Sequence, residues 1–251
     1  MIAAVCVQEP TGKRTSYDDG YESELESGPL MSTTDEDPVA SIGSLTEVAQ
    51  GKELPTTRRG MRTREALVKA ARVVFERDGF LNARLVDITT EASCSIGTFY
   101  TYFDSKEEIF AAVIEAARHD MLHPGMPHVP EDEGPAAVIE ASNRAYLVAY
   151  QRNAKLMKLM QQVAMIDPRF EEVRARSARV FGERNARRIR ELQERGLADP
   201  TVDAELASRA LSLMVSRLAF ECFALEEGPR DLEEIVAVCT RLWVNGLRLS
   251  A

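Results

Sequence analysis

The chain has 251 residues, of which 45% are hydrophobic and 28% are charged, and its formal net charge is −9 at pH 7. This apolar fraction is enough for the core of one or two domains, and it excludes disorder along the whole chain. The longest apolar run near the start, residues 2–7, is too short for a signal peptide, and no later segment has membrane-spanning length. We therefore expect a cytoplasmic protein without membrane contact. The four cysteines lie far apart with no C-x-x-C pair, which argues against a disulfide framework or a zinc finger.

The negative charge is concentrated at the N-terminus. Residues 1–55 carry 3 Lys/Arg against 11 Asp/Glu, whereas residues 56–123 carry 10 of each sign and residues 124–251 carry 18 against 19. Because residues 1–55 also lack any helical or alternating pattern, we predict a disordered acidic tail. Met31 and Met61 are possible alternative starts, so part of this tail could reflect the choice of start site. The net charge of the whole chain is therefore a poor guide to nucleic-acid binding, which depends on local clusters of charge.

Four short helices are predicted after the tail. The first begins near Thr63 and ends at Asp78-Gly79, where Gly79 suits a Schellman ending with Phe80 folding back. Its apolar stripe is Leu67, Ala70, Ala71, Val74 and Phe75. The second contains Leu85, Ile88 and Ala92, the third contains Phe99 and Phe103, and the fourth begins at Ser105, which stands at capping-box spacing from Glu108.

The rest of the chain reads as a Pro-rich acidic loop over residues 124–134 followed by five helices. Their predicted ranges are 135–151, 153–166, 168–195, 202–225 and 230–249. Asn153 and Asp167 suit N-caps, Pro135 and Pro168 suit first turns, and Gly196 suits a helix end. The predicted fold class is all-α. It consists of an N-terminal three-helix, helix-turn-helix DNA-binding domain with a connecting fourth helix over residues 56–123, and a larger helical bundle over residues 124–251.

The stretch S-I-G-T-F-Y-T-Y-F-D-S-K, residues 95–106, has the composition of a recognition helix. Phe99 and Phe103 share the inward face, which leaves hydrogen-bond donors on the outward side: Thr98, Tyr100, Thr101 and Tyr102. Gly97 lets the backbone approach DNA closely, at a cost in helix propensity. Lys106 lies in the first turn of the next helix, where it opposes the helix dipole unless a phosphate is nearby. An ordinary helical corner is the alternative.

This part of the sequence resembles the tetracycline-repressor (TetR) family of transcriptional regulators over about residues 60–120. The matching residues are Gly79, Phe80, Asp87, Ile88, Ala92, Ser95, Gly97, Thr98, Tyr100, Tyr102, Phe103, Ser105, Lys106 and Glu107. The resemblance implies a DNA-binding regulator, most often a repressor, rather than an enzyme, and no cofactor. It implies base contacts near Ser95, Ile96, Gly97 and Tyr100, and phosphate contacts from Thr98, Tyr100, Tyr102 and Lys106.

The sequence departs from the family pattern before and within the turn. Ala83 and Arg84 stand where the family usually caps the second helix with Thr or Ser, so either Asn82 caps this helix or Arg84 reaches a phosphate. Val86 and the pair Ser93-Cys94 also differ from common family residues. Four arginines precede or open the first helix and could form an arm on DNA or a solvated basic linker: Arg58, Arg59, Arg62 and Arg64.

The last two helices are candidates for a homodimer interface. Residues 202–225 are apolar around nearly the whole helix, so this helix needs cover on two sides. In the family the last two helices pair across a two-fold axis, which implies a homodimer on a palindrome-like site. The candidate interface residues are Leu211, Met214, Leu218, Cys222, Leu225, Val236, Cys239, Trp243 and Leu247. Burial within one protomer is the alternative.

A Met-rich stretch, K-L-M-K-L-M-Q-Q-V-A-M-I from Lys155, could shape an adaptable apolar pocket, although core filling is the commoner role of such a stripe. In relatives, effectors enter between the fourth helix and the helices that correspond to residues 135–195. The candidate pocket residues are Tyr146, Tyr150, Met157, Met160 and Ala164. The sparse charge suggests an apolar or lipid-like small-molecule effector.

A few residues suggest functions other than DNA binding. His119 and His123 have zinc-ligand spacing and His128 is nearby, but no Cys or carboxylate cluster joins them, so no metal is expected. Cys94 could be a redox switch, although nothing local lowers its pKa. A helical-bundle enzyme lacks a phosphate loop, a nucleophile motif and paired Glu-x-x-His motifs. An interaction protein that acts through the acidic tail, with a vestigial helix-turn-helix, is the remaining alternative.

Overall fold

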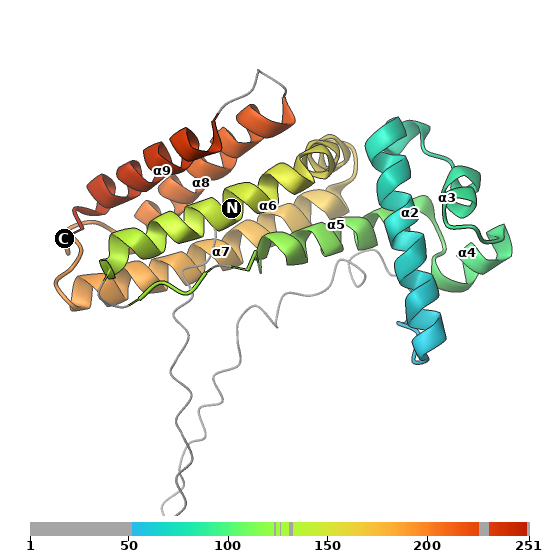
Figure 1. The fold of residues 1–251 in the computed structure, drawn as a ribbon, viewed down its shortest axis with the longest axis horizontal. Coiled ribbons are helices and arrows are strands. Elements are labelled where there is room, and N and C mark those ends of the chain that lie inside the picture. The colour runs from blue at the N-terminus through green and yellow to red at the C-terminus, as the bar shows by residue number, and fades with distance from the viewer. Residues whose placement is uncertain (1–51, 123, 126, 131–132, 226–230, 250–251) are drawn as a thin grey trace, which may run out of the picture.

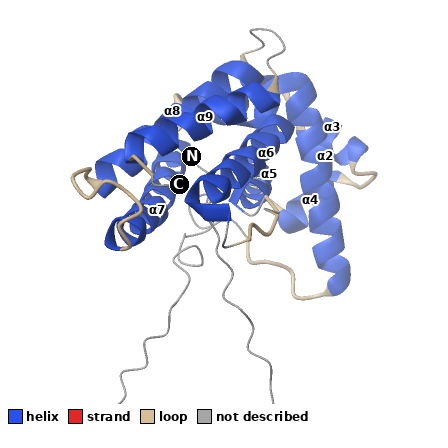
Figure 2. Ribbon diagram, turned by 60° about the vertical axis from the view of Figure 1, so that its left-hand side comes forward, coloured by secondary structure: helices blue, strands red, loops and turns tan. Residues whose placement is uncertain are grey.

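The computed structural model describes residues 52–122, 124–125, 127–130, 133–225 and 231–249, and these residues form helices and loops without a strand (Figures 1 and 2). The helices are α2 (Arg58–Asn82), α3 (Leu85–Glu91), α4 (Ile96–Tyr102), α5 (Lys106–Leu122), α6 (Gly134–Ala164), α7 (Pro168–Glu194), α8 (Ala204–Ala224) and α9 (Leu232–Leu247). Helices α2 to α4 form a small unit at one end, α6 to α9 form an elongated bundle, and α5 joins the two (Figure 1). The all-α prediction is confirmed. None of the described helices is both long and apolar enough to cross a membrane.

Phe110 on α5 links the cores of the two parts. Its ring centroid lies 5.1 Å from that of Phe75 and 4.8 Å from that of Phe80, both on α2, and 5.4 Å from that of Phe170 on α7. All four rings are at most 8% exposed. Aromatic side chains bury large areas, so this cluster contributes strongly to stability. The small unit is therefore packed onto the bundle through α5 and does not hang from a linker.

Helix α2 begins five residues before the predicted start. The Thr57 side chain accepts a hydrogen bond from the Gly60 backbone N–H at 3.1 Å and caps the helix. The arginines at 58, 59, 62 and 64 therefore lie on the helix itself and not in a linker before it. Gly79 has φ +78° and ψ 167°, so it does not form the predicted Schellman ending, which needs a left-handed helical ψ. Phe80 nevertheless folds back and stacks on Phe75.

Helix α6 is one continuous helix of 31 residues, so the predicted break with an N-cap at Asn153 is wrong. Asn153 is 0% exposed, and its amide donates to the Ala149 carbonyl at 2.9 Å and to Asp120 Oδ2 on α5 at 2.8 Å. Its Oδ1 accepts from Arg72 Nη1 on α2 at 3.0 Å. These bonds satisfy a polar side chain inside the core, so the helix continues through it.

The helix ends predicted at Asp167, Pro168 and Gly196 are confirmed, and a further cap at Asp203 was not predicted. Asp167 accepts from the Arg169 N–H at 3.0 Å and Pro168 opens α7, while Gly196 after α7 has φ +70°. Asp203 accepts from the Leu206 N–H at 2.8 Å and caps α8. The observed bounds of α8 and α9 lie within two residues of the predicted ones.

The Asn153 network connects three helices, and we predict a large stability loss when it is removed. Asn153→Leu removes the partner of Arg72 Nη1 and of Asp120 Oδ2 in a part-buried place, so the free energy of unfolding should fall by about 2–3 kcal/mol. Asn82→Ala is the matched control, because Asn82 is exposed and its amide makes one 3.3 Å bond to the Asp78 carbonyl. Its effect should stay within about 0.5 kcal/mol. Urea denaturation followed by circular dichroism measures both, and equal losses would contradict a special role for Asn153.

Candidate DNA-binding site

Helices α3 and α4 are joined by a tight turn. Ser93 adopts φ +51°, and the Ser93 and Cys94 N–H groups donate to the Thr90 and Thr89 carbonyls at 3.0 and 2.9 Å. Ser95 then caps α4 by accepting from the Thr98 N–H at 3.1 Å. The turn sets α4 across α3 with a third helix, α2, behind them. This is the arrangement of a helix-turn-helix, in which the second helix is presented to DNA.

Helix α4 turns one side inward and one side to solvent. Phe99 and Phe103 are 0% exposed and fix the inward side, as predicted. The outward side has exposed residues of the size and polarity that can meet base edges and phosphates: Ser95, Ile96, Gly97, Tyr100 and Thr101. Ile96 is 46% and Tyr100 is 49% exposed. Thr98 and Tyr102 are half-buried, and the Thr98 hydroxyl pairs with the Ser95 hydroxyl at 2.9 Å.

Gly97 has no structural reason to be glycine within the protein. A Cβ atom at this position would meet only Ser95 Oγ, at an ordinary van der Waals distance of 3.7 Å, and the residue lies inside α4. Glycine in a helix costs about 1 kcal/mol relative to alanine. A helix that keeps glycine on its exposed side suits a partner that approaches its backbone closely.

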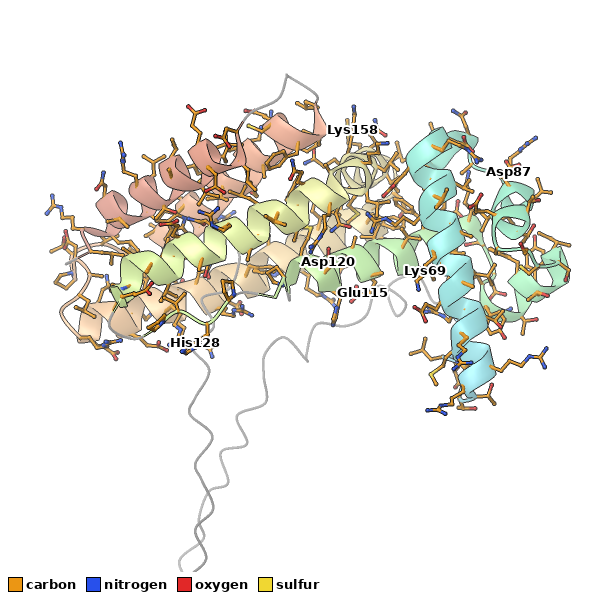
Figure 3. The ribbon with its side chains drawn as sticks, viewed as in Figure 1. Lys69, Asp87, Glu115, Asp120, His128 and Lys158 are labelled. Atoms are coloured by element: carbon orange, nitrogen blue, oxygen red, sulfur yellow. The ribbon has the colours of Figure 1, made fainter. Side chains whose placement is uncertain are left out.

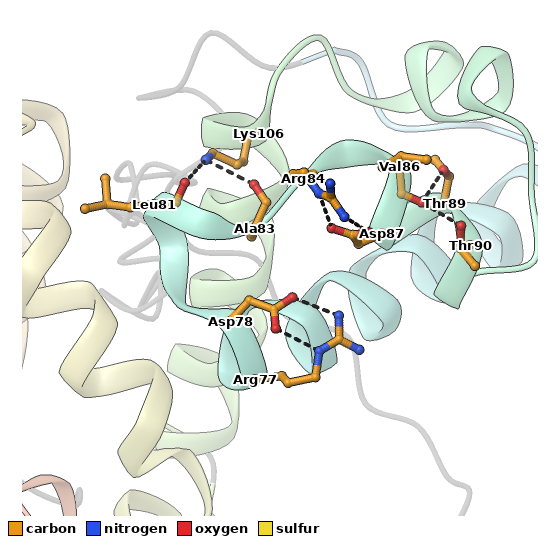
Figure 4. A network of polar contacts seen from close by, with 10 residues as sticks. All are labelled: Arg77, Asp78, Leu81, Ala83, Arg84, Val86, Asp87, Thr89, Thr90 and Lys106. Carbon is orange, nitrogen blue, oxygen red and sulfur yellow. Dashed lines mark hydrogen bonds and ion pairs between the residues drawn. The ribbon is translucent and has the colours of Figure 1, made fainter.

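Lys106 has partners inside the protein that the sequence reasoning did not predict. Its Nζ donates to the Leu81 and Ala83 carbonyls at 3.2 Å each, and it lies 4.8 Å from the centroid of the Phe80 ring (Figure 4). A cation at the start of α5 therefore does not need the phosphate that was predicted, because carbonyls at the end of α2 stabilise it. Glu107 and Glu108 in the same turn also offset the helix dipole.

Arg84 precedes α3 and is paired with Asp87. The Nε and Nη2 atoms of Arg84 donate to the two Asp87 oxygens at 2.9 and 3.0 Å, and Arg77 binds Asp78 in the same two-pronged way at 2.8 Å (Figure 4). Each guanidinium lowers the pKa of its carboxyl partner through these hydrogen bonds. The prediction that Asn82 caps α3 is wrong, since its amide donates to the Asp78 carbonyl and α3 has no side-chain cap. A shallow pocket is lined by Arg77, Asp78, Asn82, Arg84 and Asp87.

Lys52 is a residue of this site that the sequence analysis missed, because it assigned residues 1–55 to the tail. The Lys52 N–H donates to Glu108 Oε1 at 2.8 Å, and its Nζ pairs with Asp104 Oδ1 at 2.8 Å and donates to the Tyr100 carbonyl. Glu108 is 4% exposed and also accepts from the Asp104 N–H. Lys52 thus fixes the chain against the end of the recognition helix. Residues 1–51 of the predicted tail lie outside the described residues.

The metal and redox alternatives receive no support from the described residues. Within them, no group of three or more His, Cys, Asp or Glu side chains is placed to hold a metal ion. His123 lies outside the described residues, whereas His119 and His128 do not join such a group. Burial raises the pKa of the Cys94 thiol, which disfavours the reactive thiolate.

The candidate pocket residues lie in the core of the bundle. Tyr146, Tyr150, Met157 and Met160 are at most 7% exposed, while Ala164 is half-buried. The Tyr146 and Tyr150 rings lie 5.8 Å apart, and burial raises the pKa of both hydroxyls. Their contacts in this structure are those of core residues, which was the alternative given for the Met-rich stripe.

The candidate dimer residues fall into two groups. Leu211, Met214, Leu218 and Cys222 are half-buried and Leu225 is exposed. The four from α9 (Val236, Cys239, Trp243 and Leu247) are at most 5% exposed inside the protomer, so placing them on an outer interface was wrong. The apolar residues that α8 and α9 do expose are Leu206 (69%), Leu213 (54%), Val238 (46%) and Leu242 (45%). The sequence pattern did not single them out, because apolar residues lie around nearly the whole of α8, and because Val238 and Leu242 stand next to buried apolar residues on α9.

The exposed α4, held by a tight turn on a three-helix unit, defines a helix-turn-helix DNA-binding protein. Residues 67–113 match the family model described as "Bacterial regulatory proteins, tetR family". The matched residues include α3 and α4, so the chain carries the helix-turn-helix DNA-binding domain of this family, and it is similar to transcriptional regulators of the family.

Curated relatives and solved structures resemble the chain over different lengths. The HTH-type transcriptional regulator EthR of Mycolicibacterium smegmatis is 26% identical over 185 residues, which cover 72% of this chain and 84% of EthR. The HTH-type transcriptional repressor NicS of Pseudomonas putida is 43% identical over 54 residues, which cover 22% of this chain and 26% of NicS. The structure of Salmonella enterica GusR has a TM-score of 0.61 and 19% identity, and the match covers 77% of this chain and 98% of GusR. The overall fold is therefore shared with GusR at low sequence identity.

Proposed function

We propose that the chain is a ligand-responsive repressor that binds a palindrome-like operator as a homodimer. The observation that carries this proposal is the exposed side of α4, where Gly97 and Tyr100 lie together and Phe99 anchors the helix from behind. We assign Ser95, Ile96, Gly97 and Tyr100 to base contacts. Thr101, Tyr102, Arg58, Arg59 and Arg62 are assigned to the phosphate backbone, and Arg84 joins them if it leaves Asp87 for a phosphate.

A homodimer is supported by the apolar outer surface of α8 and α9. Leu206, Leu213, Val238 and Leu242 are each at least 45% exposed, and such residues gathered on two neighbouring helices mark an interaction surface. A two-fold dimer uses the same surface on both partners and brings two copies of α4 into one arrangement. Half-sites about one helical turn, about 34–36 Å, apart would then match the two recognition helices.

Effector control is supported by the way α6 is tied to the DNA-binding unit. Arg72 on α2 donates to Asn153 and to the Arg152 carbonyl on α6, at 3.0 and 2.9 Å. Arg152 and Asn153 in turn bind Asp120 on α5, at 2.8 Å each. A ligand among α5, α6 and α7 that shifts α5 or α6 would therefore move α2 and change the spacing of the two recognition helices.

Selection of genomic DNA fragments by the purified full-length protein tests the proposal. Sequencing of the bound fragments should recover a motif with two-fold symmetry, and the affinity for that motif should exceed that for unrelated DNA by at least about 10³-fold. Fragments bound without a common motif, with an affinity that depends only on salt, would contradict an operator-binding function for the ligand-free protein.

A truncation separates the operator-binding function from an interaction role of the acidic tail. Residues 1–51 carry 10 Asp/Glu and 2 Lys/Arg, so their removal takes away negative charge beside the DNA-binding unit. A chain that starts at Lys52 should keep its affinity for the selected motif within about threefold at 0.15 M salt, and should bind more tightly at low salt, where repulsion is less screened. A chain that starts at Thr57 is the control, because it also loses the Lys52 contacts and should be less stable. If the chain that starts at Lys52 loses its affinity for the motif, the acidic tail itself takes part in the function, which would contradict the proposal.

A further inference from the structure

Three buried side-chain atoms of the described residues lack a hydrogen-bond partner, and all three can donate a hydrogen bond. They are Arg118 Nε, Tyr146 Oη and Trp243 Nε1. All belong to helices outside the small DNA-binding unit, namely α5, α6 and α9. Buried polar groups in native proteins are almost always satisfied, so each exception calls for an explanation.

Of the three unpartnered atoms, the one on Arg118 is the costliest to bury, because its side chain is charged. It is 4% exposed, and its guanidinium has five N–H donors in a fixed fork. The Nη1 atom donates to Glu115 Oε2 at 2.9 Å, one turn earlier on α5, whereas Nε has no acceptor. Burial lowers the pKa of the guanidinium, and the Glu115 carboxylate opposes this shift only in part. A half-satisfied buried ion of this kind costs stability and is not explained by packing.

The surroundings of Arg118 on α5 are apolar. Ile114, four residues before it, and Met121, three residues after it, share its side of the helix and are both 0% exposed. Glu115 lies towards the outer side of α5, and its side chain is 35% exposed (Figure 3). Water therefore screens the charge of Glu115 more than that of Arg118, and a second anion near the guanidinium is less strongly repelled.

We propose that Arg118 is the anchor for the carboxylate of an amphiphilic effector, which is a carboxylic acid with an apolar chain. The carboxylate accepts from the free Nε edge of the guanidinium, and the chain lies against the apolar side chains of α5 and the Met-rich part of α6. Arginine suits this task because its planar fork matches a carboxylate in geometry. This assignment rests on the proposed effector control and specifies the chemistry of the effector.

The position of Arg118 connects the ligand to DNA binding. Helix α5 begins directly after the recognition helix, and Asp120, two residues after Arg118, is bonded to α6 through Arg152 and Asn153. A carboxylate that binds Arg118 therefore changes the position of α5, a helix that contacts both α2 and α6. The ligand would shift the balance between two arrangements of α5 in the dimer.

The test uses the full-length protein with octanoic, decanoic and dodecanoic acids and the alcohols of the same chain lengths, each below its micelle concentration. Binding is followed by the thermal midpoint of unfolding and by release of the selected DNA. The best acid should bind the wild-type protein at least about tenfold more tightly than its matched alcohol, as a charge-assisted hydrogen bond predicts. Equal binding of acid and alcohol would overturn the role of Arg118 but leave effector control standing.

Arg118→Met is the decisive variant, because methionine fills a similar space without a charge. It should unfold at the same temperature as the wild-type protein or higher, and its preference for the acid should disappear. Arg144→Met is the matched control, since Arg144 on α6 is 35% exposed and has carboxylate partners in Glu140 and Glu233. That variant should keep the preference. A strongly destabilised Arg118→Met protein would mean a structural role, and binding of no acid while the operator is still bound would exclude this class of effector; either result overturns the inference.

Discussion

Gly97→Ala should make the free protein more stable and yet impair its binding to the operator. A Cβ at Gly97 meets only Ser95 Oγ at 3.7 Å, so alanine fits without strain and raises the free energy of unfolding by up to about 1 kcal/mol. The same methyl group points away from the protein, into the space that DNA occupies when α4 lies in the major groove. The expected loss of operator affinity is about tenfold or more, comparable with the 1–3 kcal/mol of a mismatched base pair. Urea denaturation and fluorescence anisotropy with the selected DNA measure the two effects.

Gly182→Ala provides the matched control. Gly182 is an interior residue of α7, and a Cβ there meets nothing within 4 Å. This variant should gain a similar amount of stability and keep its operator affinity unchanged. If both glycine variants bind DNA as well as the wild-type protein, the backbone of α4 does not lie against DNA, and the assignment of base contacts to its first turn fails.

Leu213→Glu combined with Leu242→Glu should convert the proposed dimer into a monomer. Leu213 and Leu242 are 54% and 45% exposed in the protomer, so charges at these positions should change its own stability by no more than about 0.5 kcal/mol. In a two-fold interface each substitution occurs twice. The new carboxylates would be buried in the interface or would face one another, and either effect should raise the dimer Kd by about a hundredfold or more. Sedimentation at micromolar concentration measures the change. Because a monomer engages one half-site only, operator affinity should fall by a similar factor or more.

Met165→Glu is the control for this pair of substitutions. Met165 follows α6 and is 87% exposed. Its substitution therefore also replaces an exposed apolar side chain by a charge, but at a position away from α8 and α9. It should remain dimeric. A dimer that survives both leucine substitutions would place the interface elsewhere, and a wild-type protein that sediments as a monomer would remove the dimer from the proposed function.

Local signals in the sequence were sufficient to predict the helix-turn-helix. The cap at Ser95, the inward pair Phe99 and Phe103, and the turn before them depend on residues within a few positions of one another, and the structure reproduces them. The start of α2 was missed because Thr57, rather than a residue near Thr63, provides the cap. Short-range patterns therefore located the elements and placed their ends within a few residues.

The errors arose where the outcome depends on segments far apart in the chain. Asn153 looked like a helix cap, but its partners Asp120 and Arg72 are 33 and 81 residues away, and they allow it to stay inside a helix. Lys106 looked available for a phosphate, but it binds carbonyls 25 and 23 residues away. On α9, Leu242 and Trp243 are adjacent apolar residues, and packing against α6 and α8 determines that Trp243 turns inward and Leu242 outward. These contacts are tertiary and leave no local pattern in the sequence.

The unbroken course of α6 has a mechanical consequence. At 1.5 Å per residue, its 31 residues span about 47 Å, and along this length it contacts α2, α5, α8 and α9. If a helix of this length moves as a rigid body, a tilt of about 5° about one end displaces the other end by about 4 Å. Hydrogen bonds to base edges weaken over a much smaller displacement. The response to a ligand would thus depend on the stiffness of α6, and a sequence change that softens this rod could abolish regulation without altering any residue that touches DNA or the ligand.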